Sequence, residues 1–395
     1  MSGQAMFVYN PNAGNYFFND GHPFNPKRLR LTIDLLERVG ALSEGELFLP
    51  RKAEEAELLL VHNASYIQAV KALSVPSPDP ALLPMAEAYG FMTEDTPFFA
   101  GMHEATSHVV GGSLAAAEQV MEGRVKRALH LGGGLHHAMP NGGSGFSVYN
   151  DASVAIAHIR SRFHARVLYI DTDVHHGDGV QWTFYTEPDV CTFSIHETGK
   201  FLFPGTGFAH ERGDGEGFGA CYNMPVQPYT EDESWLHCFE ELLESIAGTF
   251  KPDLIVSQHG CDAHAYDPLS HIHCSMNIYL QMPLSIRKLA DRYCEGRWVA
   301  LGGGGYDIWR VVPRAWSLLW LVMKDHPLIG QLGADPSLKL PSGWLEAWQP
   351  DSPLVLPDTW LDPVQQWTPM PRRKEITAEN LQIKDIAMVY LPPKK

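Results

Sequence analysis

Short apolar runs alternate with helical segments along most of this sequence. Each run is bounded by glycine or charged residues, which is typical of a strand covered on both faces. Strands that alternate with helices pair in parallel, because each helix returns the chain to the same end of the sheet. The sequence therefore predicts an α/β fold with an open, mainly parallel sheet and helices on both faces. The expected strands are Met6–Tyr9, Arg127–Leu131, Val167–Asp171, Asp189–His196, Asp253–His259 and Arg297–Leu301. A closing helix is expected over Tyr306–Met323.

The run Val167–Asp171 ends directly in a cluster of metal-binding residue types. Along an extended chain, Asp171, Asp173 and His175 lie on one face. At ~3.3 Å per residue, Asp171 and His175 would be roughly 13 Å apart, so they converge only if the strand ends and bends here. The glycines at 177 and 179 permit that bend. The alternative is a polar loop whose aspartates cap the next helix.

Four of the expected strands end in glycine-rich or charged loops, at 132–137, 171–179, 260–267 and 302–306. The carboxyl ends of parallel strands lie along one edge, where ligands bind in open α/β sheets. We therefore expect the active site in a crevice at that edge. Neither glycine run has the spacing or the Lys-Ser/Thr pair of a phosphate loop. Close approach of the backbone to a narrow site explains the glycines better.

A catalytic metal site needs a few protein ligands and one open position. Asp173 and His175 supply two ligands, and the loop after the strand Asp253–His259 offers Asp262, His264 and Asp267 for a third. The spacing does not choose among these three residues. Two carboxylates and one imidazole suit zinc, but the set is also oxygen-rich enough for iron or cobalt.

Other residues at the same edge can move protons. His136 and His137 are placed to reach a metal-bound water, and a neutral imidazole near pH 7 suits proton transfer. Asp171 and Asp178 remain available as carboxylate partners that would fix the two rings. Tyr306 follows four glycines and could donate a hydrogen bond to an oxyanion.

Charge and hydropathy restrict the partners and the location. A formal net charge of −16 argues against direct nucleic-acid binding. The N-terminus lacks a basic region followed by an apolar run, and the apolar window Ser317–Met323 is too short to span a membrane. We therefore expect a cytoplasmic protein without membrane contact. The six cysteines lack Cys-x-x-Cys spacing, which favours buried reduced thiols.

The strand–helix alternation ends near residue 325. We expect a catalytic domain over 1–325 and a Pro/Trp-rich C-terminal extension over 326–395. The tryptophans of the extension argue against disorder. The extension is predicted to pack on the domain or to form a subunit contact, which would allow an oligomer.

Six segments together resemble the zinc-dependent histone deacetylase family of the arginase/deacetylase fold, and most of all its bacterial acetoin utilisation branch. They occur in the family's order within about residues 5 to 325. The matching segments are Gly133–Ala138, Ser144–Asp151, Asp171–Gly179, Phe203–Gly207, Asp267–Pro268 and Leu301–Tyr306.

The resemblance implies a ligand set for the metal. Asp173, His175 and Asp267 would bind zinc, whereas Asp262 and His264 would not. A potassium ion would also bind nearby. Its site would be formed by carbonyls and side chains around Asp171, Asp173, His175, Ser194 and Ile195.

The resemblance also implies roles in proton transfer. His137 would be the general base, paired with Asp178. His136 would pair with Asp171 and would stabilise charge or assist the leaving amine. Tyr306 would polarise the acyl carbonyl together with the metal.

The remaining matching positions would bind the substrate. Gly145 and Asp95 would hold its amide and backbone at the rim, while Phe146 and Phe203 would flank the tunnel for its aliphatic chain. The implied reaction is hydrolysis of an acyl-lysine amide on an acetylated protein, such as the metabolic enzyme acetyl-CoA synthetase. A small acetylated amine, such as an acetylpolyamine, is the alternative substrate. A third alternative is a non-catalytic acyl-lysine binder.

Overall fold

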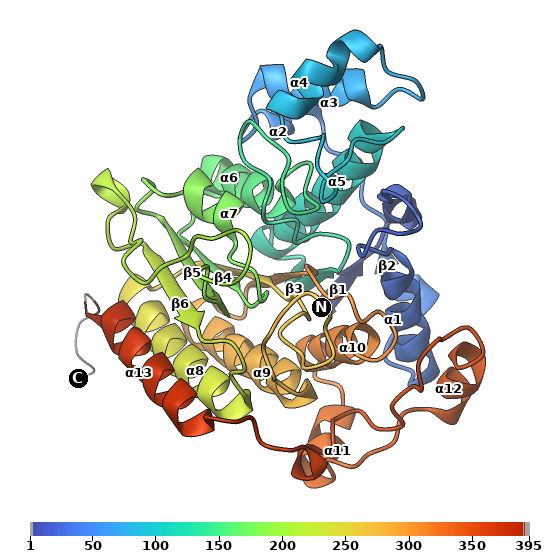
Figure 1. Ribbon diagram of the computed structural model, residues 1–395, viewed down its shortest axis with the longest axis vertical. Coiled ribbons are helices and arrows are strands. Elements are labelled where there is room, and N and C mark those ends of the chain that lie inside the picture. The colour runs from blue at the N-terminus through green and yellow to red at the C-terminus, as the bar shows by residue number, and fades with distance from the viewer. Residues whose placement is uncertain (1–2, 390, 392–395) are drawn as a thin grey trace.

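One sheet of eight parallel strands forms the centre of the molecule in the computed structural model, which describes residues 3–389 and 391 (Figure 1). Every strand pairing within it is parallel. The prediction of an open, mainly parallel α/β sheet is therefore confirmed. The strands are β1 (Gly3–Val8), β2 (Leu47–Phe48), β3 (Val125–His130), β4 (Val167–Asp171), β5 (Val190–Glu197), β6 (Cys221–Val226), β7 (Leu254–Gln258) and β8 (Trp298–Leu301), in the order β2-β1-β3-β8-β7-β4-β5-β6.

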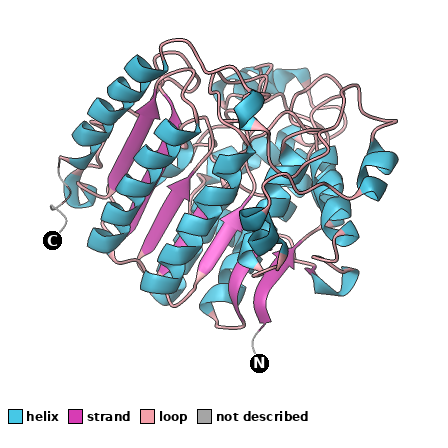
Figure 2. Ribbon diagram, turned by 90° about the horizontal axis from the view of Figure 1, so that it is seen from below, coloured by secondary structure: helices cyan, strands magenta, loops and turns pink. Residues whose placement is uncertain are grey.

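Helices cover both faces of the sheet because its strands alternate apolar side chains between two cores (Figure 2). In β4, Leu168 and Ile170 belong to one core, and Val167 and Tyr169 belong to the other. The first core is closed by α1 (Lys27–Arg38), α8 (Asp232–Phe250), α9 (Met276–Tyr293) and α10 (Val312–Met323). The second is closed by α5 (Met102–Met121), α6 (Asp151–Phe163) and α7 (Asp178–Thr183).

Four neighbouring strands bring the predicted site loops together. β3, β8, β7 and β4 are adjacent in the sheet. Their carboxyl ends are level, because His130 pairs with Leu301, Leu301 with Gln258, and Gln258 with Asp171. The loops that follow these strands therefore emerge side by side at one edge.

Short helices and long loops form a separate layer over that edge, near the N-terminal end of α5. This layer has its own apolar core, which includes Tyr16, Tyr66 and Phe91. Its α-helices are α2 (Glu55–Leu58), α3 (Ala64–Leu73) and α4 (Leu83–Ala88). The chain also has short 3-10 helices at Pro11–Asn15, Glu44–Glu46, Pro80–Leu82, Gly215–Gly217 and Val364–Gln366.

The C-terminal extension contains α11 (Leu328–Ala334), α12 (Ser342–Trp348) and α13 (Arg373–Met388). α13 runs alongside α8 and the edge strand β6 (Figure 1). Trp344 of α12 donates from Nε1 to the carbonyl of Leu31 in α1, at 3.1 Å. The domain boundary near residue 325 stays a prediction.

Two strands and one helix boundary differ from the sequence-based expectation. β2 has only two residues, and β6 contains Pro225, which weakens a strand signal and is tolerated at a sheet edge. The helix expected over 306–323 begins only at Val312, because Asp307 forms a turn that accepts from the backbone N–H groups of Arg310 and Val311.

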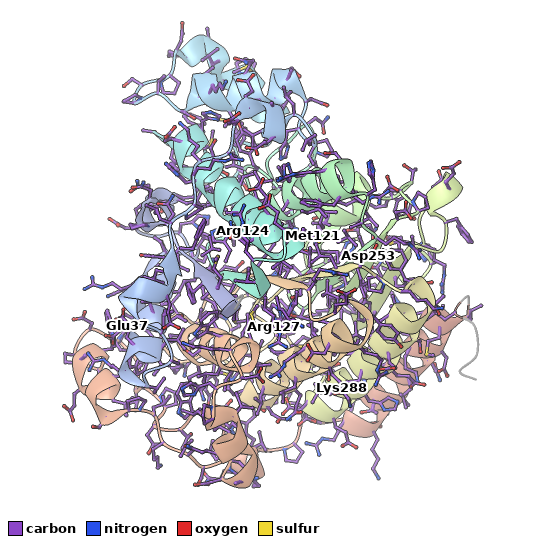
Figure 3. The ribbon with its side chains drawn as sticks, turned by 180° about the vertical axis from the view of Figure 1, so that it is seen from behind. Glu37, Met121, Arg124, Arg127, Asp253 and Lys288 are labelled. Carbon is purple, nitrogen blue, oxygen red and sulfur yellow. The ribbon has the colours of Figure 1, made fainter. Side chains whose placement is uncertain are left out.

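A buried arginine lies at the amino-terminal ends of the strands, opposite the predicted site loops. Arg127, near the start of β3, donates to Asp291 at 2.9 Å, to Asp325 at 3.3 Å and to the carbonyl of Met323 at 3.0 Å (Figure 3). Because a buried charge requires partners, these contacts fix α9 and the end of α10 against β3. No helix among the described residues is both long and apolar enough to cross a membrane.

Candidate active site

The chain folds back sharply after β4 because side chains bind the backbone there. The Asp171 carboxylate accepts from the backbone N–H of Asp173 at 3.2 Å, and the Asp173 carboxylate accepts from that of His175 at 3.0 Å. Thr172 donates its backbone N–H to the carbonyl of Gln258 in β7, at 3.1 Å. These bonds end the strand, and they bring Asp173 and His175 together.

Asp173, His175 and Asp262 form a buried group that can hold a metal ion, with one ligand atom from each within 4.8 Å of the others. His175 Nδ1 lies 3.2 Å from Oδ1 of Asp173 and 3.2 Å from Oδ2 of Asp262. Asp262 is also held by the backbone N–H of Val174, at 2.9 Å. The donors are two oxygens and one nitrogen, which suits a divalent cation.

Asp267 lies nearby but is not part of that group of three. Its two carboxylate oxygens accept from the backbone N–H groups of Tyr306 at 2.7 Å and Leu269 at 3.0 Å. His264 contacts a different part of the molecule, since its Nε2 lies 2.8 Å from Asp362 of the C-terminal extension. Of the three residues that the spacing left open, Asp262 and Asp267 are therefore at the site, and His264 is behind it.

The charges of this group favour a cation. Burial and the neighbouring Asp173 raise the pKa of Asp262 to about 6, and burial together with Asp262 raises the pKa of Asp267 well above its usual range. Burial would lower the pKa of His175, but its hydrogen bonds to Asp173 and Asp262 raise it to about 10. The raised pKa values show that deprotonated carboxylates are costly at this buried position, and a bound metal ion would stabilise them in place of the protons.

A second group of metal-binding residue types, Glu57, Glu118 and His158, is only half-buried. Its carboxylates already pair with Arg51 and Arg162. We assign no site to it.

Two adjacent imidazoles lie beside the metal-binding group, each held by a carboxylate. His136 Nδ1 is 2.8 Å from Asp171, and His137 Nδ1 is 2.6 Å from Asp178. Their Nε2 atoms are 3.0 Å apart. Tyr169 donates its hydroxyl to Asp171 at 2.7 Å, which fixes that carboxylate in turn.

The two imidazoles have opposite pKa shifts. Burial would lower the pKa of His136, but the charges of Asp171 and Asp173 outweigh it and raise the pKa to about 9. Burial and the charge of His136 lower the pKa of His137 to about 4, against the opposing effect of Asp178. One ring therefore holds a proton near neutral pH and the other can accept one, which is the arrangement that acid–base catalysis uses.

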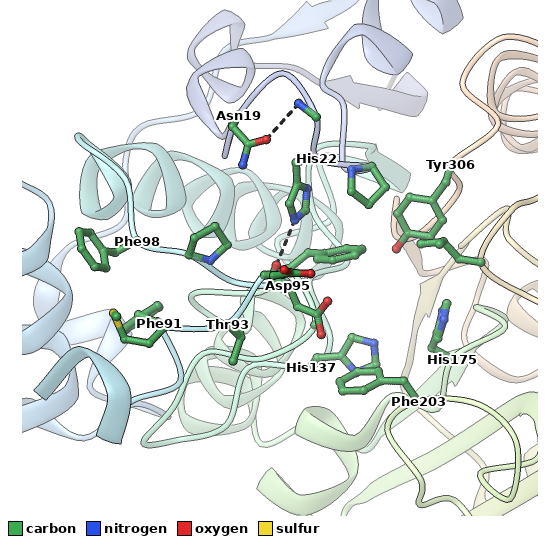
Figure 4. A pocket seen from close by; sticks show the side chains of 18 of the residues that line it. Asn19, His22, Phe91, Thr93, Asp95, Phe98, His137, His175, Phe203 and Tyr306 are labelled. Atoms are coloured by element: carbon green, nitrogen blue, oxygen red, sulfur yellow. Dashed lines mark hydrogen bonds between the residues drawn. The ribbon is translucent and has the colours of Figure 1, made fainter. Parts of the chain in front are cut away.

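An apolar cavity of about 870 Å³ leads from the surface to these residues (Figure 4). His137, His175, Phe203 and Tyr306 lie together at its inner end. Phe146 also lines the cavity. The Phe146 and Tyr306 rings are 5.6 Å apart, and the His137 and Phe203 rings are 5.0 Å apart. Burial raises the pKa of Tyr306 well above its usual range, so its phenol keeps a proton to donate.

Gly145 lies where any side chain would close the cavity. Its φ of +48° is in the left-handed region, and a Cβ there would lie 2.4 Å from Cδ2 of His137 and 2.9 Å from Cε1 of Phe203. Only glycine satisfies both constraints.

The rim of the cavity joins two loops that are distant in sequence. Nε2 of His22 lies 3.1 Å from the carbonyl of Asp95, and Thr96 accepts the backbone N–H of Phe146 through its hydroxyl at 3.1 Å (Figure 4). Asp95 and Glu94 are both exposed and line the mouth.

The sequence reasoning missed two residues of this region. His22 is not among the site residues expected from the sequence, but its ring lines the cavity. Arg28 in α1 is buried beneath the site, where it donates to the carbonyl of Gly305 at 3.2 Å and stacks on Phe24 and Trp316. One of several basic residues in an amphipathic helix gives no signal of this contact.

Comparison with known families decides the classification. The histone deacetylase domain family matches residues 22–323. The chain belongs to the histone deacetylase family. It is 50% identical over 381 residues to the acetoin utilization protein AcuC of Bacillus subtilis (strain 168), covering 96% of this chain and 95% of the relative. It is 45% identical over 378 residues to AcuC of Staphylococcus xylosus, covering 95% of both.

Solved structures agree with this classification. A histone deacetylase (HDAC) homologue complexed with SAHA superimposes with a TM-score of 0.83 at 28% identity, covering 96% of this chain and all of that one. An HDAC homologue from Aquifex aeolicus gives a TM-score of 0.81 at 27% identity, with the same coverage. These findings confirm three predictions: the histone deacetylase family, its fold, and deacetylase activity, which is that of an amidohydrolase.

The raised pKa of His175 predicts that metal affinity depends on pH. In the metal-free protein this imidazole holds a proton up to a pH of about 10. A metal can bind only the deprotonated ring, so binding releases that proton. The apparent metal affinity of this deacetylase-family protein should rise with pH, by up to about tenfold per pH unit for one released proton.

Chelator competition at pH 6.5, 7.5 and 8.5 measures this dependence. Correction for the chelator's own protonation is the necessary control. An affinity that does not change with pH would show that His175 is already neutral before the metal binds.

Proposed function

We propose that this protein hydrolyses the amide bond of acylated lysine side chains, with zinc as its metal. The observation that carries the proposal is the pair His136–His137, with its opposite pKa shifts, beside a metal-binding group at the inner end of an apolar cavity. A long unbranched side chain would bring its amide to these residues. Membership of the histone deacetylase family supports the same reaction.

Asp173, His175 and Asp267 are the proposed zinc ligands. The raised pKa of Asp267 supports a role beside a cation, because its carboxylate is destabilised without one. Asp262 would then orient His175 through the 3.2 Å contact between them. The oxygen-rich donor set is also compatible with iron or cobalt. When bound, the metal would polarise the acyl carbonyl and lower the pKa of a water.

His137 is the proposed general base, because its low pKa leaves Nε2 free to accept a proton from the attacking water. Asp178 fixes the ring through Nδ1. His136, which Asp171 keeps protonated, would donate to the leaving amine. Tyr306 would donate its phenol to the developing oxyanion.

Four residues are proposed to bind the substrate. Phe146 and Phe203 flank the aliphatic chain of the lysine, and Gly145 accepts the hydrogen of its amide. Asp95, at the rim, would hold the substrate backbone. The backbone carbonyl of Asp95 already contacts His22, so the position of this rim is fixed before the substrate arrives.

An acetylated lysine on a protein is the proposed substrate, with acetyl-CoA synthetase as the candidate. The cavity extends from the tunnel to Phe91, Met92 and Phe98, where polypeptide next to the lysine would lie. Figure 4 shows Phe91 and Phe98 away from His175 and Tyr306. The two relatives described above are named for acetoin utilisation, which fits a metabolic substrate. Glu94 and Asp95 at the mouth give a specific reason to retain a cationic acetylpolyamine as the alternative.

Several expectations remain predictions. These are the potassium site near Asp171 and Ser194, a cytoplasmic location, the absence of nucleic-acid binding and an oligomer formed through the C-terminal extension. Asp171 and Ser194 are register partners in β4 and β5, which supports the proposal of a potassium site there. The non-catalytic alternative is disfavoured, since a binder would not need the His136–His137 pair.

The ligand assignment predicts different outcomes for two neighbouring aspartates. Asp267→Ala, like Asp173→Ala, should remove most bound metal, whereas Asp262→Asn should lower the affinity by about 10- to 100-fold and still bind one metal at saturation. Metal analysis after dialysis, followed by titration with zinc, measures both. Full occupancy in Asp267→Ala would refute its assignment as a ligand.

The proton-transfer roles predict that His137→Ala keeps its metal and loses about 10²- to 10⁴-fold in turnover, or roughly 3–5 kcal/mol of transition-state stabilisation. Steady-state kinetics on an acetyl-lysine peptide, with metal content measured in parallel, tests this loss. If His137→Ala turned over normally and His136→Ala did not, the two roles would be reversed.

The substrate proposal predicts a higher kcat/KM on acetyl-lysine peptides than on N-acetylputrescine. A panel of acetyl-, propionyl-, lactyl- and succinyl-lysine peptides beside N-acetylputrescine measures the preference. A tenfold or greater preference for N-acetylputrescine, about 1.4 kcal/mol, would replace the protein substrate with the polyamine. Binding of these compounds without turnover would identify a non-catalytic acyl-lysine binder.

A further inference from the structure

A buried hydrogen bond joins the C-terminal extension to the loop that carries Asp262 and Asp267. His264, in the middle of that loop, has its Nε2 2.8 Å from Oδ2 of Asp362. The side chain of His264 is 0% exposed and that of Asp362 is 4% exposed. The ring of Trp367 lies 6.0 Å from the ring of His264 on the same side.

The direction of this hydrogen bond is fixed. Nδ1 of His264 accepts the backbone N–H of Tyr266 at 3.1 Å, so the ring proton is on Nε2 and is donated to Asp362. Burial lowers the pKa of His264, which agrees with a neutral ring. This imidazole therefore bridges the backbone of the active-site loop and a carboxylate of the extension.

Asp362 is itself held by the two helices that flank the loop. Its Oδ1 accepts from Arg314 of α10 at 2.8 Å, and its Oδ2 also accepts the backbone N–H of Met276, the first residue of α9, at 2.7 Å. Burial would raise the pKa of Asp362, but His264 and Arg314 lower it well below its usual range. A charged carboxylate with three donors is a rigid point of attachment.

On the inner side, the same loop holds the proposed metal ligand. The carbonyl of His264 accepts the backbone N–H of Asp267 at 2.8 Å, and the Asp267 carboxylate accepts that of Tyr306 at 2.7 Å. One residue, His264, thus separates Asp362 from the bonds that place Asp267 and Tyr306.

We propose that Asp362 is a positioning residue: through His264, the C-terminal extension sets the place of Asp267 and Tyr306 in the active site. The inference rests on the proposed function only in taking Asp267 as a metal ligand. Trp367 of the extension also packs on the rings of His264 and Tyr266, at 6.0 and 5.8 Å, but this contact is apolar and fixes no hydrogen-bond geometry. Further polar contacts of the extension are made with other elements. Asn380, for example, binds Thr230 and Ser234, and Trp344 binds α1.

The test is Asp362→Asn, which keeps the shape of the side chain. One of its two oxygens becomes an amide that cannot accept from the donors at that position. Metal should be lost to a chelator about 10- to 100-fold faster, in the range seen for residues that support metal ligands. kcat should fall with little change in KM, and the backbone amides of Tyr266 and Asp267 should exchange hydrogen faster in the metal-free protein.

Asp232→Asn is the matched control. The Asp232 carboxylate is half-buried, and it accepts the backbone N–H of Ser275, one residue before α9, at 2.7 Å. It makes no hydrogen bond to His264. This variant should lower Tm without changing metal release or the exchange of Tyr266 and Asp267. Asp358→Asn removes only an exposed contact with Lys339 in the same extension. It should change neither metal release nor the hydrogen exchange of Tyr266 and Asp267.

His264→Phe breaks the same link from the other side and leaves Asp362 bound to Arg314 and Met276. It should speed metal release to a similar extent. The double variant His264→Phe/Asp362→Asn should be no worse than the more affected single variant, because both remove one interaction. His264→Phe also provides the test if Asp362→Asn does not fold.

Wild-type metal release and hydrogen exchange in Asp362→Asn or in His264→Phe, despite a lower Tm, would overturn the proposal. Additive effects of the two substitutions would do the same. Because metal release and exchange do not require turnover, these outcomes decide the role of Asp362 even if no acyl-lysine substrate is hydrolysed.

Discussion

The buried carboxylate of Asp173 is the contact on which the site depends. It accepts hydrogen bonds from three strand ends: from His175 after β4 at 3.0 Å, from Gln258 of β7 at 2.7 Å and from Gly304 after β8 at 2.8 Å. A carboxylate can be buried only when it is bound in this way. The same group that is proposed to bind the metal therefore aligns the loops of three adjacent strands.

The glycine-rich loop after β8 follows from this arrangement. A Cβ on Gly304 would lie 2.1 Å from Oδ2 of Asp262 and 2.8 Å from Oδ2 of Asp173. The space that a side chain would need is filled by the carboxylates. The glycines thus allow negative charge to be concentrated, which is what a cation site requires and what a stable core otherwise avoids.

Much of the fold could be predicted from sequence because β4, β5 and β7 are mainly apolar runs, buried along their whole length, between helices with clear spacing. The edge strands could not, since β6 contains Pro225 and β2 is very short. At the site, Asp173 and His175 could be predicted to lie together because they are only two residues apart in the sequence. The positions of Asp262 and Asp267 depend on the path of their loop, which the spacing does not encode. Arg28 and Asp362 act through contacts with distant residues, so no local pattern could identify them.

The edge strand β6 ends a sheet whose backbone groups could pair with another chain. α13 lies along this edge, and Asn380 accepts the backbone N–H of Gln227, the residue after β6, at 2.8 Å. At the other edge β2 is only two residues long. A covered edge and a short one are the devices by which natural sheets avoid joining edge to edge. The last helix therefore also protects the folded enzyme against aggregation, and nascent chains would expose β6 until α13 has been synthesised.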